Sequence, residues 1–254
     1  MTRKAWLIAG GIVAALTVAF GIFQAVSLLS RSTDEATTRF DGVRHLVIDN
    51  DAGSIRMRPS VDGGLTVHRT ETRGITGPDY SERMEGDRLI IDADCPGAFT
   101  SWCEVQLEIL VPAGVDVDAS GGGGSVRADG LDASLRLRSS GGGITVVGGG
   151  SVLDLESSGG SVNVEAARAD QLTARSSGGS VRVRSAVVPR TVEARSSGGS
   201  VTVEVPDGPT AYRVDASSSG GSTRNQVRTD PTSDRLITAR SSGGSVTVRY
   251  LSPT

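Results

Sequence analysis

The chain has 254 residues, a formal net charge of −3 and only 4% aromatic residues. This length is enough for one anchor and one sizeable domain, and the near balance of charge gives no reason to expect a nucleic-acid partner. Glycine accounts for 34 residues, roughly twice its usual share of about 7%. Because many of these glycines recur inside a repeated motif, we interpret them as structural corners and not as a flexible linker.

The N-terminal region has the pattern of a membrane anchor. Arg3 and Lys4 precede an uncharged apolar stretch over residues 5–29, which as a helix would be about 37 Å long and could cross a ~30 Å hydrocarbon core. A signal peptide has a shorter apolar region and a small-residue cleavage site. We therefore predict an uncleaved transmembrane signal anchor; the alternative is cleavage near Ala25. The two cations predict that residues 1–4 are a cytoplasmic tip and that the chain beyond the anchor is extracytoplasmic.

The next section is predicted to be a linker followed by a less regular β region. Residues 30–41 are polar and mixed in charge, which predicts a juxtamembrane linker, and residues 42–114 begin the β domain. A first repeat-like copy covers His45–Met57, and apolar runs predict further strands at Leu65–Val67, Leu89–Ile91 and Val105–Val111. The polar segment 74–87, which is punctuated by glycine and proline, is predicted to be an exposed excursion.

Residues 115–250 repeat one phrase: two small residues, two glycines, a small residue, then two apolar residues spaced two apart. The clearest copies are Ser176–Val181, Ser196–Val201 and Ser241–Val246, and the period of roughly 20 residues is the signature of a stacked array. A second pair of apolar residues precedes each copy, so each repeat is predicted to be a strand, a corner and another strand, with one face of each strand buried. Since the buried positions change parity across the motif, the serines and glycines are expected to form a tight corner where stacked backbones come close.

One such coil cannot bury its own apolar face, so neighbouring coils must stack. We therefore predict an all-β fold, a single-domain β-solenoid or β-helix over residues 42–250, with a short tail at 251–254. The coils are expected to follow one another in chain order, about 4.8 Å apart.

The cysteines and histidines give little support for catalytic or metal chemistry. Cys95 and Cys103 flank a turn-rich spacer, and outside the cytoplasm we predict that they form a disulfide; the alternative is two free thiols. With no histidine nearby they do not match a zinc motif, and the corners lack the aspartate of a calcium-binding β-roll. His45 and His68 are the only histidines, no G-x-S-x-G elbow frames a serine, and no glycine run continues as a phosphate loop. We therefore predict no catalytic residue, no metal and no cofactor.

A column of arginines recurs on the predicted outward face, shortly before the corners. Its basic members are Arg138, Arg175, Arg195 and Arg240. Stacking in chain order would place Arg175 and Arg195 on adjacent coils, with Arg138 beyond Glu156 and Arg240 beyond Ser217. Like charges at one strand spacing are unfavourable unless an anion lies between them, so this column is a candidate face for an anionic partner. The alternative is an ordinary solvated face, with Glu156, Glu193 and Glu204 as counter-charges.

Taken with the predicted anchor and the Val111-Pro112-Ala113-Gly114 strand end, the serine-glycine corners make the chain resemble a known family. Over roughly residues 45–250 it is similar to the toastrack or "putative adhesin" domains of unknown function in bacterial envelope proteins. The resemblance implies a β-solenoid and a surface or envelope role, sometimes linked to membrane-stress signalling, and it supplies no catalytic residues. The cysteine pair and the very regular corners depart from the family pattern.

The expected function is that of a non-enzymatic, membrane-anchored envelope protein whose solenoid serves as an adhesion, interaction or scaffold module. Its expected partners are the membrane and an envelope polymer, a lipid headgroup or another envelope protein. One alternative is the ectodomain of an envelope-stress sensor. The short cytoplasmic tip of four residues argues against signalling without a membrane partner. The other is an enzyme acting on envelope polysaccharide, which would need paired carboxylates on one outward face. The outward acids Asp118, Asp154, Glu193 and Asp215 instead occur one per coil.

Overall fold

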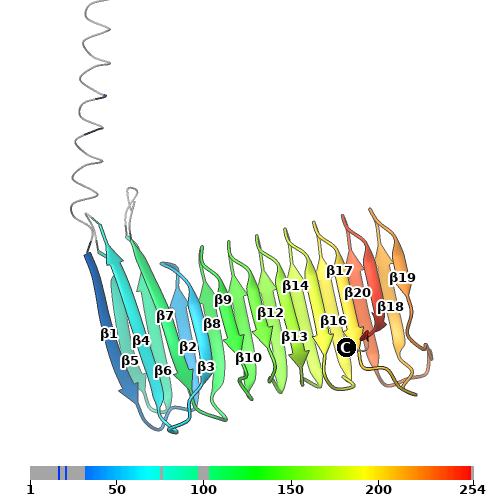
Figure 1. Cartoon of the computed structure of the whole chain (residues 1–254), viewed down its shortest axis with the longest axis horizontal. Coiled ribbons are helices and arrows are strands. Elements are labelled where there is room, and N and C mark those ends of the chain that lie inside the picture. Colours follow the sequence, from blue (N-terminus) through cyan, green and yellow to red (C-terminus); the bar gives the residue numbers. More distant parts are fainter. Residues whose placement is uncertain (1–16, 18–20, 22–31, 75–76, 97–102, 253–254) are drawn as a thin grey trace, which may run out of the picture.

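The computed structural model shows two long β-sheets that pack face to face, with the strands of each sheet side by side along the rod (Figure 1). The structure describes residues 17, 21, 32–74, 77–96 and 103–252. The predicted span over residues 5–29 therefore lies outside the described residues except for Thr17 and Gly21. Within the described ranges, no helix is both long enough and apolar enough to cross a membrane.

Sheet A has eleven strands and sheet B has ten. In spatial order, sheet A contains β1 (Ser32–Phe40), β4 (Leu65–Arg73), β7 (Glu104–Val111), β3 (Ile55–Pro59), β9 (Val126–Asp129), β11 (Ile144–Val147), β13 (Val162–Ala167), β15 (Val181–Ser185), β17 (Val201–Val205), β21 (Val246–Tyr250) and β19 (Thr223–Asn225). Sheet B contains β18 (Arg213–Ser218), β20 (Leu236–Ser241), β16 (Thr191–Ser196), β14 (Gln171–Ser176), β12 (Val152–Ser157), β10 (Ser134–Ser139), β8 (Asp116–Gly121), β2 (His45–Asn50), β6 (Arg88–Asp94) and β5 (Asp79–Glu85).

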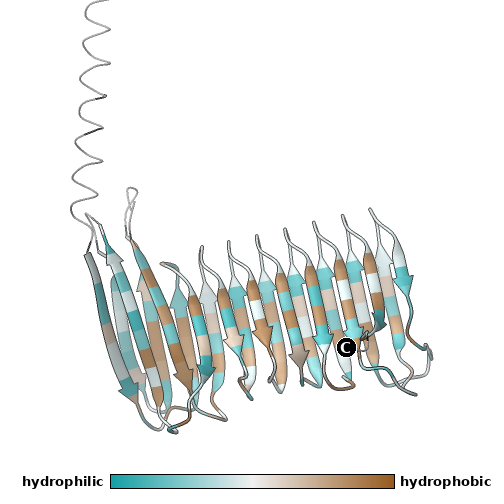
Figure 2. Ribbon diagram, viewed as in Figure 1, coloured by the Kyte–Doolittle hydropathy of each residue, from teal (hydrophilic) through white to brown (hydrophobic). Residues whose placement is uncertain are grey.

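The strands of the repeats pair in parallel and in register, which confirms the all-β, solenoid-like fold. Val162, Val181 and Val201, the first apolar residues after three successive corners, are Cα partners on β13, β15 and β17. Their side chains, and those two residues further on, point inward and are almost completely buried. Figure 2 shows the resulting alternation of hydrophobic and hydrophilic residues along the strands. A thin core of valine, leucine and alanine therefore continues from coil to coil.

The corners are built from the serines and glycines, as predicted. The Ser176 hydroxyl is buried and donates a hydrogen bond to Gly160 O of the preceding coil, at 2.8 Å. The Gly179 N–H donates to the same hydroxyl at 2.9 Å. Equivalent pairs of bonds occur at Ser157, Ser196, Ser218 and Ser241. The first serine of these five motifs therefore holds its own corner and joins it to a neighbouring coil.

The expectation that coils stack in chain order is wrong at both ends of the rod. At the N-terminal end, β2 and β3 lie between β6/β7 and β8/β9, although β6 and β7 follow them in the chain. The last coil in the sequence, β20 and β21, lies between the β16/β17 coil and the β18/β19 coil. Composition explains this order. The inward residues of β20 and β21 are apolar and fully buried, whereas β19 has Thr223 and Asn225 at the matching positions. A coil with a polar inner face is stable at the end of a stack, where water reaches it, so the apolar coil occupies the inner place.

The N-terminal end also departs from the predicted boundaries. Residues 32–40, which we expected in the linker, form β1, and the predicted excursion 74–87 contains β5. Both strands are antiparallel to their neighbours and lie at sheet edges. Their polar composition, which we interpreted as loop, is that of edge strands, because charged residues there discourage pairing with another chain.

The predicted disulfide is present between Cys95 and Cys103, whose Cα atoms are 5.9 Å apart. It follows β6 of sheet B and precedes β7 of sheet A. The spacer residues 97–102 lie outside the described residues.

Candidate functional site

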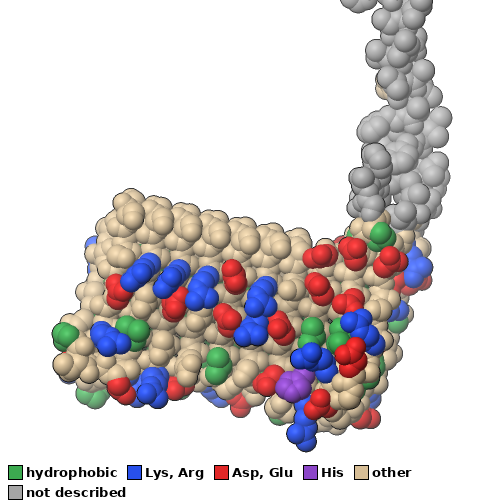
Figure 3. All heavy atoms as spheres, turned by 180° about the vertical axis from the view of Figure 1, so that it is seen from behind, with side chains coloured by type: hydrophobic (Ala, Val, Ile, Leu, Met, Phe, Trp, Pro, Cys, Tyr) green, Lys and Arg blue, Asp and Glu red, His purple; other side chains and the backbone are tan. Residues whose placement is uncertain are grey.

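Three of the four predicted arginines form a continuous row across sheet B. Arg175 on β14 is the Cα partner of Arg195 on β16, which is in turn the partner of Arg240 on β20. Arg240 is therefore adjacent to Arg195 and not separated from it by Ser217, which is on the outer strand β18. The row is longer than predicted because β20 is inserted between β16 and β18. Figure 3 shows it as three neighbouring basic side chains beside a ridge that carries no charged side chains.

Arg138 lies in the same outward column but is separated from this row. Glu156 on β12 lies between it and Arg175, and Arg138 Nη1 is 3.3 Å from Asp118 Oδ1. We therefore define the arginine row as Arg175, Arg195 and Arg240 only.

Carboxylates compensate part of the charge of the arginine row. Glu193 accepts from Arg175 Nη2 at 2.7 Å and lies 3.1 Å from Arg195 Nε, while Arg240 pairs with Asp215. Glu204, predicted as a further counter-charge, instead lies on sheet A and binds Arg184 and Arg249. The three guanidinium side chains stay 42–49% exposed, so they can reach a ligand from solvent.

A shallow groove of about 360 Å³ runs beside the arginine row. Its opposite side is formed by the second serines of the corner motifs, which the sequence analysis treated only as corner residues. These exposed serines are Ser177, Ser197, Ser219 and Ser242. The register of the corners places their hydroxyls at the same step as the arginines. The groove therefore offers fixed charges on one side and hydroxyl groups on the other.

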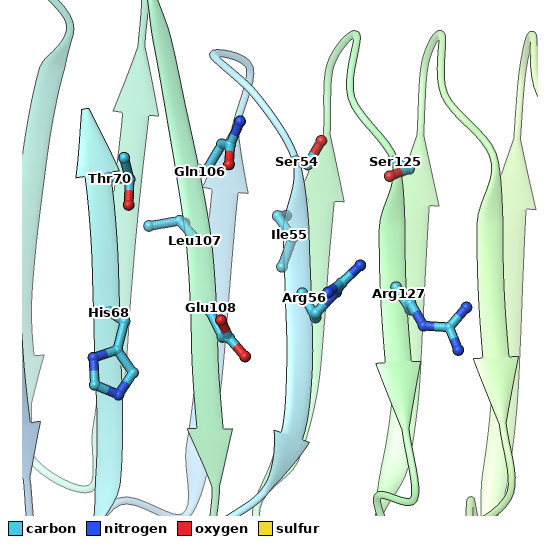
Figure 4. A pocket seen from close by; sticks show the side chains of 10 residues that line it. All are labelled: Ser54, Ile55, Arg56, His68, Thr70, Gln106, Leu107, Glu108, Ser125 and Arg127. Atoms are coloured by element: carbon cyan, nitrogen blue, oxygen red, sulfur yellow. The ribbon is translucent and has the colours of Figure 1, made fainter. Parts of the chain in front are cut away.

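A second hollow, of about 330 Å³, lies on the outer face of sheet A. It is lined by two rows of side chains from β4, β7, β3 and β9, as Figure 4 shows. One row is neutral and the other contains Arg56, Glu108 and His68. His68 Nδ1 and the Thr37 hydroxyl form a hydrogen bond of 2.9 Å. The sequence does not reveal this site, because β7 and β9 are far from β3 and β4 in the chain.

The third polar feature is a groove of about 420 Å³ near the N-terminal end of sheet B. It contains five aspartates: Asp49, Asp51, Asp79, Asp92 and Asp94. Burial raises the pKa of Asp49, and the negative charges of Asp51, Asp92 and Asp94 raise it further. Among the described residues, no three or more acidic, cysteine or histidine side chains are grouped so that they could hold a metal ion.

The comparisons with known proteins place the chain in a family. Similar solved structures include a "putative adhesin" from Bacteroides fragilis, with a TM-score of 0.48 and 15% identity over 87% of this chain and 97% of that one. A "putative cell adhesion protein" from Clostridium sporogenes has a TM-score of 0.41 and 12% identity over 87% of this chain and all of the other. A "putative lipid binding protein" from Parabacteroides distasonis has a TM-score of 0.39 and 12% identity, over 87% and 97% of the two chains.

None of the curated proteins matches the chain. The model of one protein family, Toastrack DUF4097, matches residues 113–250, which include all of the serine-glycine repeats. The chain therefore belongs to the Toastrack DUF4097 family.

Proposed function

We propose that this protein is a non-enzymatic, membrane-anchored interaction module of the cell envelope that binds an extended anionic polymer along the arginine row. The observation that carries the proposal is the register of Arg175, Arg195 and Arg240 on three adjacent parallel strands. A linear polymer with regularly spaced phosphate or carboxylate groups could contact all three guanidinium groups when it lies along the rod.

The charge balance of the groove supports binding of an anion. Parallel strands hold the three arginines about 4.8 Å apart. Among the described residues, Glu193 and Asp215 pair with them at 3.3 Å or less, and Asp154 lies 3.9 Å from Arg175. Glu193 already lies against both Arg175 and Arg195, so an anionic group would chiefly relieve the repulsion between Arg195 and Arg240. Each guanidinium also offers a planar fork of donors that suits phosphate and carboxylate oxygens.

The exposed serines support a polymer as the ligand in preference to a single ion. Ser177, Ser197 and Ser242 follow the same step as the arginines, so every additional polymer unit meets another hydroxyl. Individually weak contacts at several points add through multivalency.

The test is binding of long-chain polyphosphate to the full-length chain in zwitterionic nanodiscs, with orthophosphate and anionic nanodiscs as comparators. We expect polyphosphate to bind at least roughly tenfold more tightly than orthophosphate because of multivalency, and its affinity to fall with added salt. The double variant Arg195→Gln with Arg240→Gln should weaken polyphosphate binding about tenfold or more, because each substitution removes a charge-assisted hydrogen bond to the polymer.

Arg224→Gln is the matched control, because Arg224 is exposed on β19 of the other sheet. Equal affinity of the double variant and the control, or binding that salt does not weaken, would contradict the proposal. Binding to anionic nanodiscs alone would indicate lipid headgroups as the partner in place of a polymer.

A further inference from the structure

The hollow on sheet A brings hydrogen-bonding groups from two neighbouring rows of side chains to one concave place. Its first row follows the strand registers across Thr70, Gln106, Ser54 and Ser125, and its second row across His68, Glu108, Arg56 and Arg127. The side chains of Ile55 and Leu107 point into the core. The hollow therefore forms where a row that contains the short side chains of Thr70, Ser54 and Ser125 lies beside a row of longer ones.

The serines of the hollow are free, whereas serines in the same column of later coils are not. The hydroxyls of Ser161, Ser180 and Ser200 each accept a backbone N–H from the neighbouring coil, at 3.1–3.2 Å. In the part of the chain that the structure describes, the hydroxyls of Ser54, Ser125 and Thr70 have no such partner. Coil stacking therefore does not need them, and they remain available as donors to a ligand.

Arg56 is the free cation of this site. The neighbouring Glu108 pairs with Arg58 at 2.7 Å, and Arg127 pairs with Asp129 at 2.8 Å. No carboxylate of the described residues lies within ion-pair distance of Arg56. Figure 4 shows the Arg56 side chain lying between β3 and β9, while the Arg127 side chain turns away from it toward the next strand.

We propose that this hollow is a second binding site, which takes one acidic sugar unit. The Arg56 guanidinium binds the anionic group of the sugar through its fork of donors. The hydroxyls of Ser54, Ser125 and Thr70 donate to the remaining oxygens, and Glu108 accepts from sugar hydroxyls. The volume of about 330 Å³ is at the lower end for small-molecule sites and is suited to one ring. The site is on the opposite sheet from the arginine row, so it does not depend on the proposed polymer groove.

The experiment measures binding to the full-length chain in zwitterionic nanodiscs by saturation-transfer NMR. Four probes distinguish the ligand: glucuronate, glucose 6-phosphate, glucose and inorganic phosphate. We expect glucuronate or glucose 6-phosphate to bind, and glucose and phosphate to bind at least tenfold more weakly. Whichever acidic sugar binds more tightly identifies carboxylate or phosphate as the anionic group.

The variant Arg56→Gln should weaken acidic-sugar binding at least tenfold, and Ser125→Ala several-fold. Arg182→Gln is the matched control, because Arg182 is exposed in the same outward column of sheet A but outside the hollow. It should change affinity less than twofold. The proposal is overturned if neither acidic sugar binds, if glucose or phosphate binds as well as they do, or if Arg56→Gln and Arg182→Gln have equal effects.

Discussion

Single residues at the corners decide whether neighbouring coils can stack. A Cβ atom added to Gly179 would lie 2.5 Å from the Gly160 carbonyl carbon and 2.6 Å from Ser161 N, both backbone atoms of the preceding coil. The equivalent glycines Gly160, Gly199 and Gly244 meet the backbone of the neighbouring coil in the same way. These positions therefore need glycine because of the close approach of two backbones.

The variant Gly179→Ala should lower the free energy of unfolding by about 1–3 kcal/mol, as overpacking does in well-packed proteins. Gly123→Ala is the control, because a Cβ at Gly123 has nothing within 4 Å. Thermal or denaturant unfolding compares the two. Equal losses would show that backbone contact between corners is not the cause.

The acidic groove predicts a pH dependence of stability. The folded protein raises the pKa of Asp49 above its ordinary 3.8 through burial and three neighbouring carboxylates. The folded state therefore binds this proton more tightly than the unfolded state, and the ionised form of Asp49 destabilises the fold. This destabilisation is present above the raised pKa and is lost as the pH falls toward 3.8.

Accordingly, Asp49→Asn should raise the melting temperature at neutral pH, and the gain over the unmodified protein should shrink as the pH falls through the raised pKa. Asp132→Asn, at an exposed loop position, is the control. A gain that is the same at both ends of the pH range would exclude electrostatic repulsion as its origin.

At the scale of elements, the inserted coil determines the arginine row. Stacking in chain order would have placed β18 beside β16 and left Ser217 between Arg195 and Arg240. The observed order makes Glu193 the Cα partner of Thr238, and Thr238 the partner of Asp215. Glu193 and Asp215 are therefore two strand spacings apart.

Cysteine pairs can distinguish the two orders. Parallel neighbours are about 4.8 Å apart, within the Cα range that a disulfide spans, whereas two spacings, about 9.6 Å, exceed it. Under oxidising conditions, the double variant Glu193→Cys with Thr238→Cys should therefore form a disulfide between the two new cysteines. The double variant Glu193→Cys with Asp215→Cys should not. Mass spectrometry of the unreduced protein detects the cross-linked peptides. A disulfide in the second variant and none in the first would show that the coils stack in chain order.

At the scale of the whole molecule, the two ends of the rod are closed differently. At the N-terminal end, Arg69 of sheet A lies over the Tyr80 ring of sheet B, 4.0 Å from its centre. The buried Glu71 pairs with Arg69 at 2.9 Å and with Arg73 at 2.7 Å, so a charged network covers the core there. At the C-terminal end, β18 and β19 each pair on one side only, and Val214 and Ala216 are only partly buried.

Hydrogen exchange should follow this asymmetry. Coils that contact a single neighbour open at lower free energy than inner coils, so the amides of β18 and β19 should exchange well before those of β12–β15. Mass spectrometry of the full-length chain after timed exposure to deuterated water measures this. Uniform protection along the rod would instead show that the solenoid opens as one cooperative unit.

The repeat by itself determined the all-β class, the stacked coils, the inward columns and the role of the corner serines and glycines. It could do so because side chains alternate along a strand and every coil repeats the same requirement for burial. The tertiary structure decided the order of the end coils, since coils with similar edges can stack in more than one order, and the burial of their inner residues selects among these. It likewise decided that the polar segments around Ala36 and Ser81 are edge strands. The hollow around Arg56 exists only because β4, β7, β3 and β9 lie side by side, although β7 and β9 are far from β3 and β4 in the chain.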